Sequence, residues 1–157
     1  MPARRDRRSR FSAELTVLIV DDEETPRSVT RRMIRALGYQ AQIAHDGREA
    51  LRYLQQHPGE VRLLLTDMVM PYMDGGELAE RARDLHPHLP IVLMSANPVG
   101  EIAELIAAYP ELPFITKPFT TEKLSQVLTP LLGGSARARG RRANERVPYR
   151  DRTRQPG

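Results

Sequence analysis

Four short apolar segments of this 157-residue chain each deliver a polar side chain that can take part in chemistry. In chain order these side chains are Asp21 and Asp22 after the first segment, Asp67 in the second, Ser95 in the third and Lys117 after the fourth. Carboxylates that cluster without a cation repel one another, which raises the pKa of at least one of them. Mg²⁺ would relieve that repulsion, because it binds one or two carboxylates and keeps several waters.

Such a set of groups is equipped to accept a phosphoryl group. Asp67 would attack phosphorus and become an acyl phosphate. The metal and Lys117 would neutralise the oxygens of the transferring group, and the hydroxyl of Ser95 would donate to them. The alternative is structural, with the aspartates serving only as turn residues and Lys117 as a surface cation.

The segments that must position these residues read as five strands alternating with five helices. The strands are expected at 16–20, 40–44, 63–67, 91–95 and 114–116. The apolar runs at 16–20 and 63–67 suit strands that are buried on both faces, although periodicity alone does not distinguish such a run from a short buried helix. Helices are expected after each strand, at 26–37, 47–57, from 75 to about 85, through 102–106 and at 121–132. Asp74 and Glu77 have the spacing of a capping box for the third helix.

The first helix shows both a start signal and a face. Thr25 can cap it, Pro26 suits its first position and Gly38 ends it. Its expected buried residues recur every fourth position (Val29, Met33 and Leu37), with arginines on another face (Arg27, Arg31 and Arg35). In the later helices we expect burial of Ala50, Leu51, Leu54, Leu78, Ala82, Leu85, Leu124, Val127, Leu128 and Leu131.

Alternating strands and helices predict an α/β fold with a parallel sheet covered on both faces. The second strand is partly polar, which is typical of a sheet edge. The favoured architecture is therefore a single flavodoxin-like, doubly wound sheet with strand order 2-1-3-4-5 and five helices. Its switch point lies between strands 1 and 3, so the ends that carry Asp21, Asp22 and Asp67 should meet.

The charge is unevenly distributed along the chain. Residues 1–12 carry a net charge of +4 and residues 133–157 carry +6, whereas residues 13–132 carry −6. We expect one folded domain at 13–132 between a basic disordered arm and an arginine-rich disordered tail. Cysteine is absent, which excludes disulfides and thiolate metal sites. No signal peptide or membrane-length apolar run is present, so a cytoplasmic location without membrane contact is expected.

The motifs in this order resemble the response-regulator receiver domain of two-component signalling. The resemblance covers residues 15–132 and rests on four stretches: Val20-Asp21-Asp22-Glu23, Asp67 with the loop Met70-Pro71-Tyr72-Met73-Asp74-Gly75, Ser95-Ala96, and Lys117-Pro118-Phe119. It implies that Asp67 is the phosphoacceptor, and that Mg²⁺ or Mn²⁺ is held by Asp21, Asp22, Asp67 and the Val69 carbonyl. It also implies a cis bond before Pro118.

The resemblance further implies a switch. Ser95 stands where Thr is usual, and Phe114 stands where the family often has a Tyr that turns inward on activation. Val69 and Asn97 flank the expected phosphate and would tune dephosphorylation. An apolar Val69 cannot orient attacking water, so a long-lived phosphoryl state is expected.

The implied partners are a histidine kinase or histidine phosphotransfer protein, and a downstream protein that binds the face of the fourth helix, fifth strand and fifth helix. We expect a stand-alone switch that assists its own phosphorylation and dephosphorylation, and no turnover enzyme. Two alternatives stay open: a receiver-like scaffold that takes no phosphate, and a receiver-regulated nucleic-acid binder. In the latter the arginine-rich arms would make weak, non-specific phosphate contacts. His86 and His88, which flank Pro87, are read as loop residues because further metal ligands are lacking.

Overall fold

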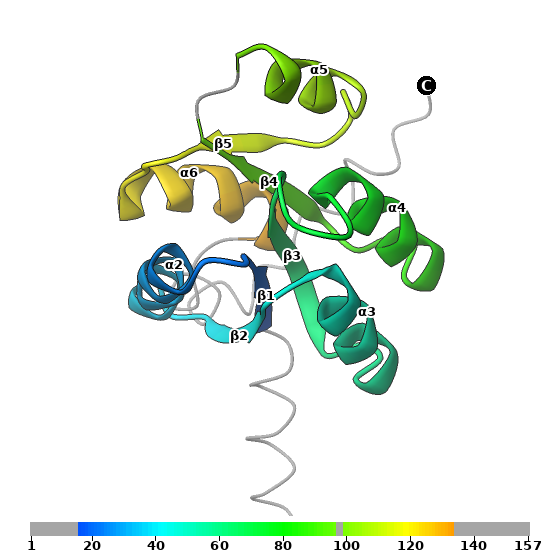
Figure 1. The fold of residues 1–157 in the computed structure, drawn as a ribbon. Coiled ribbons are helices and arrows are strands. Elements are labelled where there is room, and N and C mark those ends of the chain that lie inside the picture. The colour runs from blue at the N-terminus through cyan, green and yellow to red at the C-terminus, as the bar shows by residue number, and fades with distance from the viewer. Residues whose placement is uncertain (1–15, 97–98, 134–157) are drawn as a thin grey trace, which may run out of the picture.

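The computed structural model describes residues 16–96 and 99–133, and these form a five-stranded parallel sheet with helices on both faces (Figure 1). The elements in chain order are β1 (Thr16–Val20), α2 (Glu24–Ala36), β2 (Gln40–Ala44), α3 (Gly47–Gln56), β3 (Val61–Asp67), α4 (Gly75–Leu85), β4 (Ile91–Ser95), α5 (Glu101–Ala107), β5 (Phe114–Thr116) and α6 (Thr121–Leu132). The strand order is β2-β1-β3-β4-β5, which confirms the predicted flavodoxin-like architecture.

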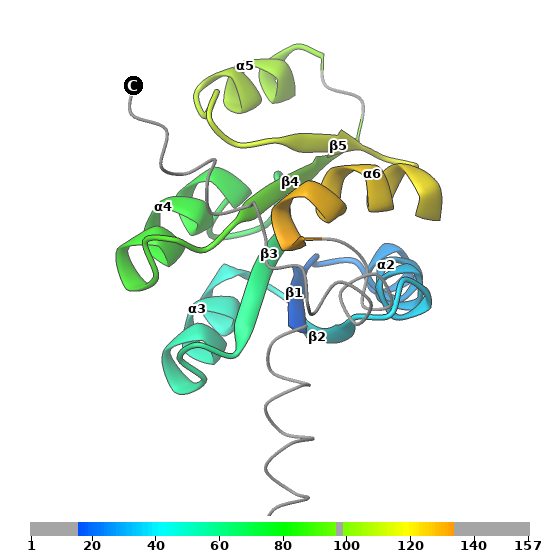
Figure 2. The same ribbon diagram turned by 180° about the vertical axis from the view of Figure 1, so that it is seen from behind.

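The two faces of the sheet carry separate apolar cores. The ribbon seen from behind shows α2 and α6 on one side of the sheet and α3 and α4 on the other (Figure 2). Helices α2 and α6 cover one face over residues such as Ile19, Leu65 and Leu128. Helices α3, α4 and α5 cover the other face over residues such as Leu18 and Leu64. Consecutive residues at 17–20 of β1 and 63–65 of β3 thus alternate between two buried cores, which explains why these stretches are apolar without a break.

The start and the buried face of α2 differ from the prediction. The helix begins at Glu24, and its N-cap is Glu23, which makes no side-chain capping bond, so the assignment of Thr25 as the cap was wrong. Its buried residues are Arg27, Thr30 and Ile34, and the predicted Met33 and Leu37 pack half-buried against the same core. Val29 is 38% exposed, because the helix is turned so that Arg27 faces the end of β1.

The other helices follow the prediction more closely. Asp74 accepts a hydrogen bond from Glu77 N, as the capping-box spacing predicted. Asp46, which the sequence reading did not single out, caps α3 in the same way through Glu49 N. Leu85, which was expected to be buried, is exposed because it lies in the last turn of α4. Three other expected core residues are half-buried at the margins of the cores (Leu51, Val127 and Leu131). Leu132 is buried.

No helix in the described parts of the chain is long and apolar enough to cross a membrane. The expected arm at 1–12 lies outside the described residues, as does the tail beyond Gly133.

Candidate functional site

The register of the strands brings the side chains that can take part in chemistry together at the carboxyl-terminal end of the sheet. Val20 of β1 pairs with Thr66 of β3, and the two strands are parallel. The residues that follow this pair, Asp21 and Asp67, therefore lie side by side. Ser95 pairs with Thr116, and Lys117 N donates to the Ser95 carbonyl oxygen over 2.7 Å. The carboxyl ends of β1, β3, β4 and β5 therefore converge, as parallel strands in this order require.

Asp21 is fully buried, and each of its acceptor groups is bonded. Its Oδ1 accepts from Glu23 N over 3.0 Å, and its Oδ2 accepts from Lys117 Nζ over 2.8 Å. Its main-chain oxygen accepts from Arg27 Nη1 over 2.9 Å. The carboxylate thus lies in a fixed orientation at the end of β1. The prediction had placed Arg27 on another face of the helix than the buried residues; the structure shows it 8% exposed and bonded to Asp21.

Asp67 ends β3 and is 9% exposed. Its Oδ1 accepts from Met68 N over 3.1 Å, and its Oδ2 lies 3.4 Å from Lys117 Nζ. Burial raises the pKa of Asp67 to about 6, with further raising by the charges of Asp21 and Asp22, while Lys117 opposes the rise. Its carboxylate is therefore unusually basic and still mostly ionised at neutral pH, which suits a nucleophile.

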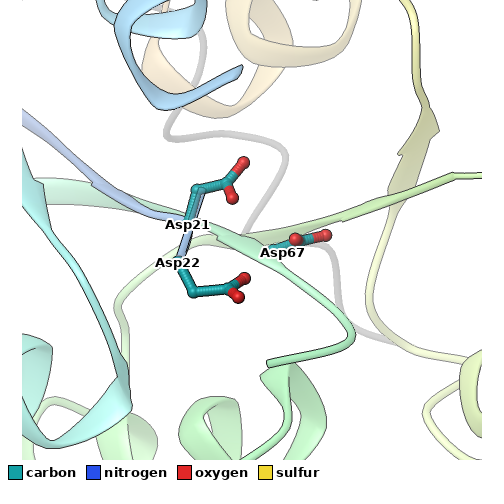
Figure 3. Close-up of side chains that lie close together, drawn as sticks. All are labelled: Asp21, Asp22 and Asp67. Carbon is teal, nitrogen blue, oxygen red and sulfur yellow. The ribbon is translucent and has the colours of Figure 1, made fainter. Parts of the chain in front are cut away.

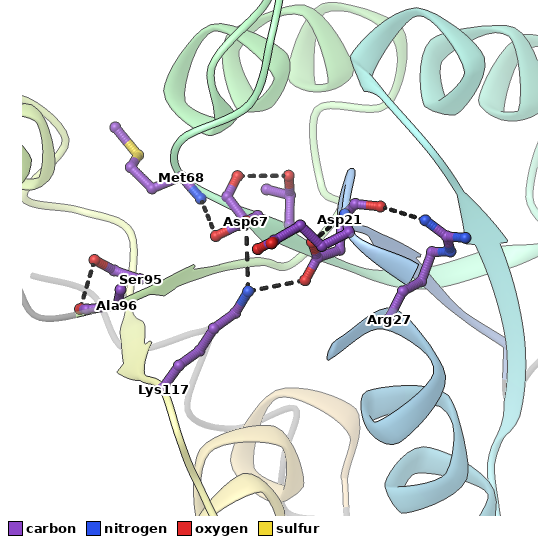
Figure 4. Close-up of polar contacts among 9 residues, drawn as sticks. Asp21, Arg27, Asp67, Met68, Ser95, Ala96 and Lys117 are labelled. Carbon is purple, nitrogen blue, oxygen red and sulfur yellow. Dashed lines mark hydrogen bonds and ion pairs between the residues drawn. The ribbon is translucent and has the colours of Figure 1, made fainter. Parts of the chain in front are cut away.

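Lys117 connects the two buried aspartates (Figure 4). Burial lowers the pKa of its ammonium, but the hydrogen bond to Asp21 and the charges of Asp67 and Asp21 outweigh that effect, so the pKa is raised overall. Lys117 therefore stays protonated. It supplies one positive charge against the three carboxylates of the cluster.

Asp21, Asp22 and Asp67 lie close enough to share a cation (Figure 3). One carboxylate oxygen from each lies within 4.8 Å of the others, and Asp22 is exposed while the other two are buried. Three carboxylates against one ammonium leave an excess of negative charge, and all the donors are oxygen atoms. This donor set fits a hard divalent cation such as Mg²⁺, and one side of the cluster stays accessible to solvent through Asp22.

The remaining residues singled out from the sequence occupy different places. Ser95 is buried, and its Oγ donates to the Ala96 carbonyl oxygen over 3.0 Å instead of pointing to Asp67 (Figure 4). Phe114 is 43% exposed on the edge strand β5, and Val69 is 53% exposed beyond β3. The Lys117–Pro118 peptide bond is cis. Asn97 lies outside the described residues.

Sequence reasoning missed a close backbone approach at Gly75. A Cβ at this position would collide with the carbonyl oxygen of Asp67 and lie 3.0 Å from the Cα of Met68. Gly75 N donates to the Met68 carbonyl oxygen over 2.7 Å, which ties the start of α4 to the end of β3. The Gly75-Gly76 pair was a visible signal, because glycine often marks a place where two backbones meet.

Comparisons with known proteins agree with this geometry. Residues 17–129 match the family model described as response regulator receiver domain. The sensor kinase CckA of Brucella abortus is 32% identical over 122 residues, which cover 78% of this chain and 13% of that protein. The chain thus spans only a small part of the curated relatives that it matches first.

Two solved structures are similar in fold. The receiver domain of the hybrid histidine kinase CckA has a TM-score of 0.62 at 30% identity, covering 74% of this chain and 98% of that one. The receiver domain of the sensor histidine kinase PA1611 of Pseudomonas aeruginosa, solved with a magnesium ion in its active site cleft, has a TM-score of 0.69 at 24% identity, covering 76% and 98%. The matched region, the strand order and the cluster of three aspartates agree, and the chain belongs to the response regulator receiver domain family of two-component systems.

Proposed function

We propose that this chain is a phosphoacceptor switch in which Asp67 takes a phosphoryl group from a phosphohistidine. The donor would be a histidine kinase or a histidine phosphotransfer protein. The observation that carries the proposal is the buried Asp67 carboxylate, whose Oδ2 lies 3.4 Å from Lys117 Nζ beside a second buried aspartate. A buried nucleophile, a cation and an acidic cluster at one edge of the sheet together suit phosphoryl transfer.

The proposed transfer moves one phosphoryl group without an oxidant or a further reactant. A carboxylate oxygen of Asp67 attacks phosphorus while the phosphorus–nitrogen bond of the donor breaks. The electron pair of that bond stays on the imidazole nitrogen, and the product on Asp67 is an acyl phosphate. Lys117 is placed to neutralise an oxygen of the transferring group, because its ammonium already contacts Asp67.

A divalent cation at the acidic cluster would supply further neutralisation of the phosphoryl oxygens when it is bound. Asp21, Asp22 and Asp67 would hold it, together with the main-chain carbonyl of Val69. Mg²⁺ is the cation that we propose, and Mn²⁺ could take the same oxygen donors. Support comes from the spacing of the three carboxylates and from the magnesium ion in the similar PA1611 receiver domain.

The proposed response to phosphorylation runs through Ser95 and Phe114. Ser95 would exchange its bond to the Ala96 carbonyl for one to the phosphoryl group by changing its χ1 rotamer. Phe114 would then turn inward from its exposed position, altering the face formed by α5, β5 and α6. We propose that a downstream protein reads this face. The folded unit would span residues 13–132.

Labelling by a small phosphodonor tests the proposal directly. The wild-type chain should take up one phosphoryl group from acetyl phosphate in the presence of Mg²⁺, and Asp67→Asn should take up none. Asp84→Asn is the matched control, because Asp84 is an exposed residue of α4. Persistent labelling of Asp67→Asn would sink the assignment of the phosphoacceptor.

A second candidate function rests on the charges of the two arms, which carry +4 and +6 against a domain of −6. Such arms can contact nucleic-acid phosphates without sequence specificity, and that binding weakens steeply with salt. The test is a salt titration of binding to duplex DNA, with and without residues 134–157. Removal of the tail should flatten the salt dependence, and an absence of binding at low salt would dispose of the idea.

A further inference from the structure

We infer that Arg27 is a positioning residue that holds Asp21 in the orientation needed to bind a divalent cation. The inference rests on the proposed function in so far as it takes the acidic cluster to be the cation site. Arg27 lies in the first turn of α2 and is 8% exposed, whereas the other arginines of this helix are exposed (Arg31, Arg32 and Arg35).

The contact that carries the inference is the bond from Arg27 Nη1 to the main-chain oxygen of Asp21, at 2.9 Å. Figure 4 shows Arg27 and Lys117 approaching Asp21 from different sides. Arg27 does not touch the carboxylate. It fixes the backbone from which the carboxylate projects, and therefore the direction in which the carboxylate can offer its oxygens.

The bond from Arg27 to Asp21 matters most when Lys117 no longer contacts Asp21. Lys117 Nζ now lies on Asp21 Oδ2, the side chain of a proposed cation ligand. A phosphoryl group on Asp67 would compete for this ammonium, and a cation at the cluster would repel it. When the Lys117 bond is lost, Asp21 is still held by the bond from Glu23 N to its Oδ1, by its own N–H, which donates to the Ala44 carbonyl oxygen over 3.3 Å, and by Arg27. Of these, Arg27 provides the only side-chain donor. Groups that orient a metal ligand in this way typically change metal affinity by about 10- to 100-fold.

Position and charge predict opposite effects for Arg27. In the part of the chain that the structure describes, no carboxylate forms an ion pair with the guanidinium of Arg27. Its positive charge therefore lies on the main-chain side of Asp21 and is not neutralised by a direct partner. Charge alone would oppose a second cation there, and removing it would tighten cation binding. Positioning predicts weaker binding after removal. The sign of the change therefore separates the two roles.

The experiment is calorimetric titration of the full chain with MgCl₂ at pH 7.5, without any phosphodonor. Arg27→Met should weaken Mg²⁺ binding about tenfold. Arg27→Lys keeps the charge and one donor group, so it should recover part of the affinity. Arg31→Met removes an exposed arginine of the same helix and should leave the affinity unchanged.

Equal or tighter binding by Arg27→Met would overturn the inference. The titrations are made at a temperature at which circular dichroism shows every variant to be folded. A variant with a lower Tm but an unchanged Kd for Mg²⁺ would also count against the inference. If Arg27→Met does not fold, Arg27→Lys decides: about threefold weaker binding supports positioning, and unchanged binding overturns it. A wild-type chain that binds no Mg²⁺ would overturn the proposed cation site as well, whereas normal wild-type binding with unaffected variants would overturn only the role of Arg27.

Discussion

The ammonium of Lys117 donates to the buried carboxylate of Asp21 over 2.8 Å, although the two residues lie 96 positions apart in the chain. Asp21 is fully buried, and the ammonium is half-buried above it. A buried carboxylate without a cation is costly, so this contact supports the site in the absence of metal. Lys117 also reaches Asp67 at 3.4 Å, which makes it the centre of the charge balance.

Replacement of Lys117 by Met should destabilise the metal-free protein by about 3 kcal/mol, because Asp21 would be left buried without its cation. Addition of Mg²⁺ should recover part of the loss, since a bound cation stabilises the folded state that binds it. Urea unfolding with EDTA or with Mg²⁺ measures both effects. Lys123→Met is the matched control: Lys123 is exposed on α6, and its replacement should change stability by less than about 0.5 kcal/mol. Equal effects of the two substitutions would contradict the prediction.

The raised pKa of Asp67 predicts that this residue lowers the free energy of unfolding of the metal-free protein in a pH-dependent way. The pKa is about 6 in the folded chain and 3.8 as a reference for the unfolded chain. Between these values the folded state holds a proton that the unfolded state has released, so this group favours folding increasingly as pH falls. Above pH 6 the ionised carboxylate costs up to about 3 kcal/mol.

Asp67→Asn should therefore be more stable than the wild type at pH 7.5 in EDTA, and this advantage should shrink as pH falls through 6 and vanish near 4. The difference between the two urea-unfolding free energies, measured across this range, isolates Asp67 from the other carboxylates. Asp84→Asn should show no such trend, since Asp84 is exposed. If the stability of Asp67→Asn relative to the wild type increased as pH falls, the prediction would be contradicted.

Two neighbouring glycines should respond differently to alanine. At Gly75 the added Cβ meets main-chain atoms of Asp67 and Met68, whereas at Gly76 it meets the ring of Tyr109. Backbone cannot give way without moving the end of β3, but a side chain can rotate. We expect Gly75→Ala to cost about 3 kcal/mol or more and Gly76→Ala about 1–2 kcal/mol. Thermal unfolding compares them, and a larger loss at Gly76 would refute the ranking.

Val69→Asn should shorten the lifetime of the proposed acyl phosphate on Asp67. Val69 is 53% exposed and apolar, so it offers attacking water no hydrogen bond. An amide that contributes about 1 kcal/mol by orienting this water would speed decay roughly fivefold. The decay is followed after removal of the small phosphodonor, with Val69→Ala as an apolar control. Unchanged decay in Val69→Asn would count against a role for this position.

The sequence by itself determined the architecture and the strand ends. The apolar runs at 16–20 and 63–67 favoured strands buried on both faces, and the alternation of such runs with helical segments favoured a parallel sheet. The weak run at 40–44 suited an edge, so the order β2-β1-β3-β4-β5 was predicted, and the structure confirms it. That order alone predicts the meeting of Asp21, Asp22 and Asp67, because parallel strands end at the same edge.

Only the tertiary structure decided how α2 is turned and what Arg27 does. The spacing of Val29, Met33 and Leu37 predicted one buried face, but the buried residues are Arg27, Thr30 and Ile34. Met33 and Leu37 are half-buried against the core, and Val29 is exposed. A periodic pattern records which residues are apolar, whereas a buried arginine depends on an acceptor from another element, here the carbonyl of Asp21. The rotamer of Ser95 and the approach of Gly75 to Asp67 are likewise properties of packed neighbours. Local sequence does not encode those distances, because they are set when the strands and helices assemble.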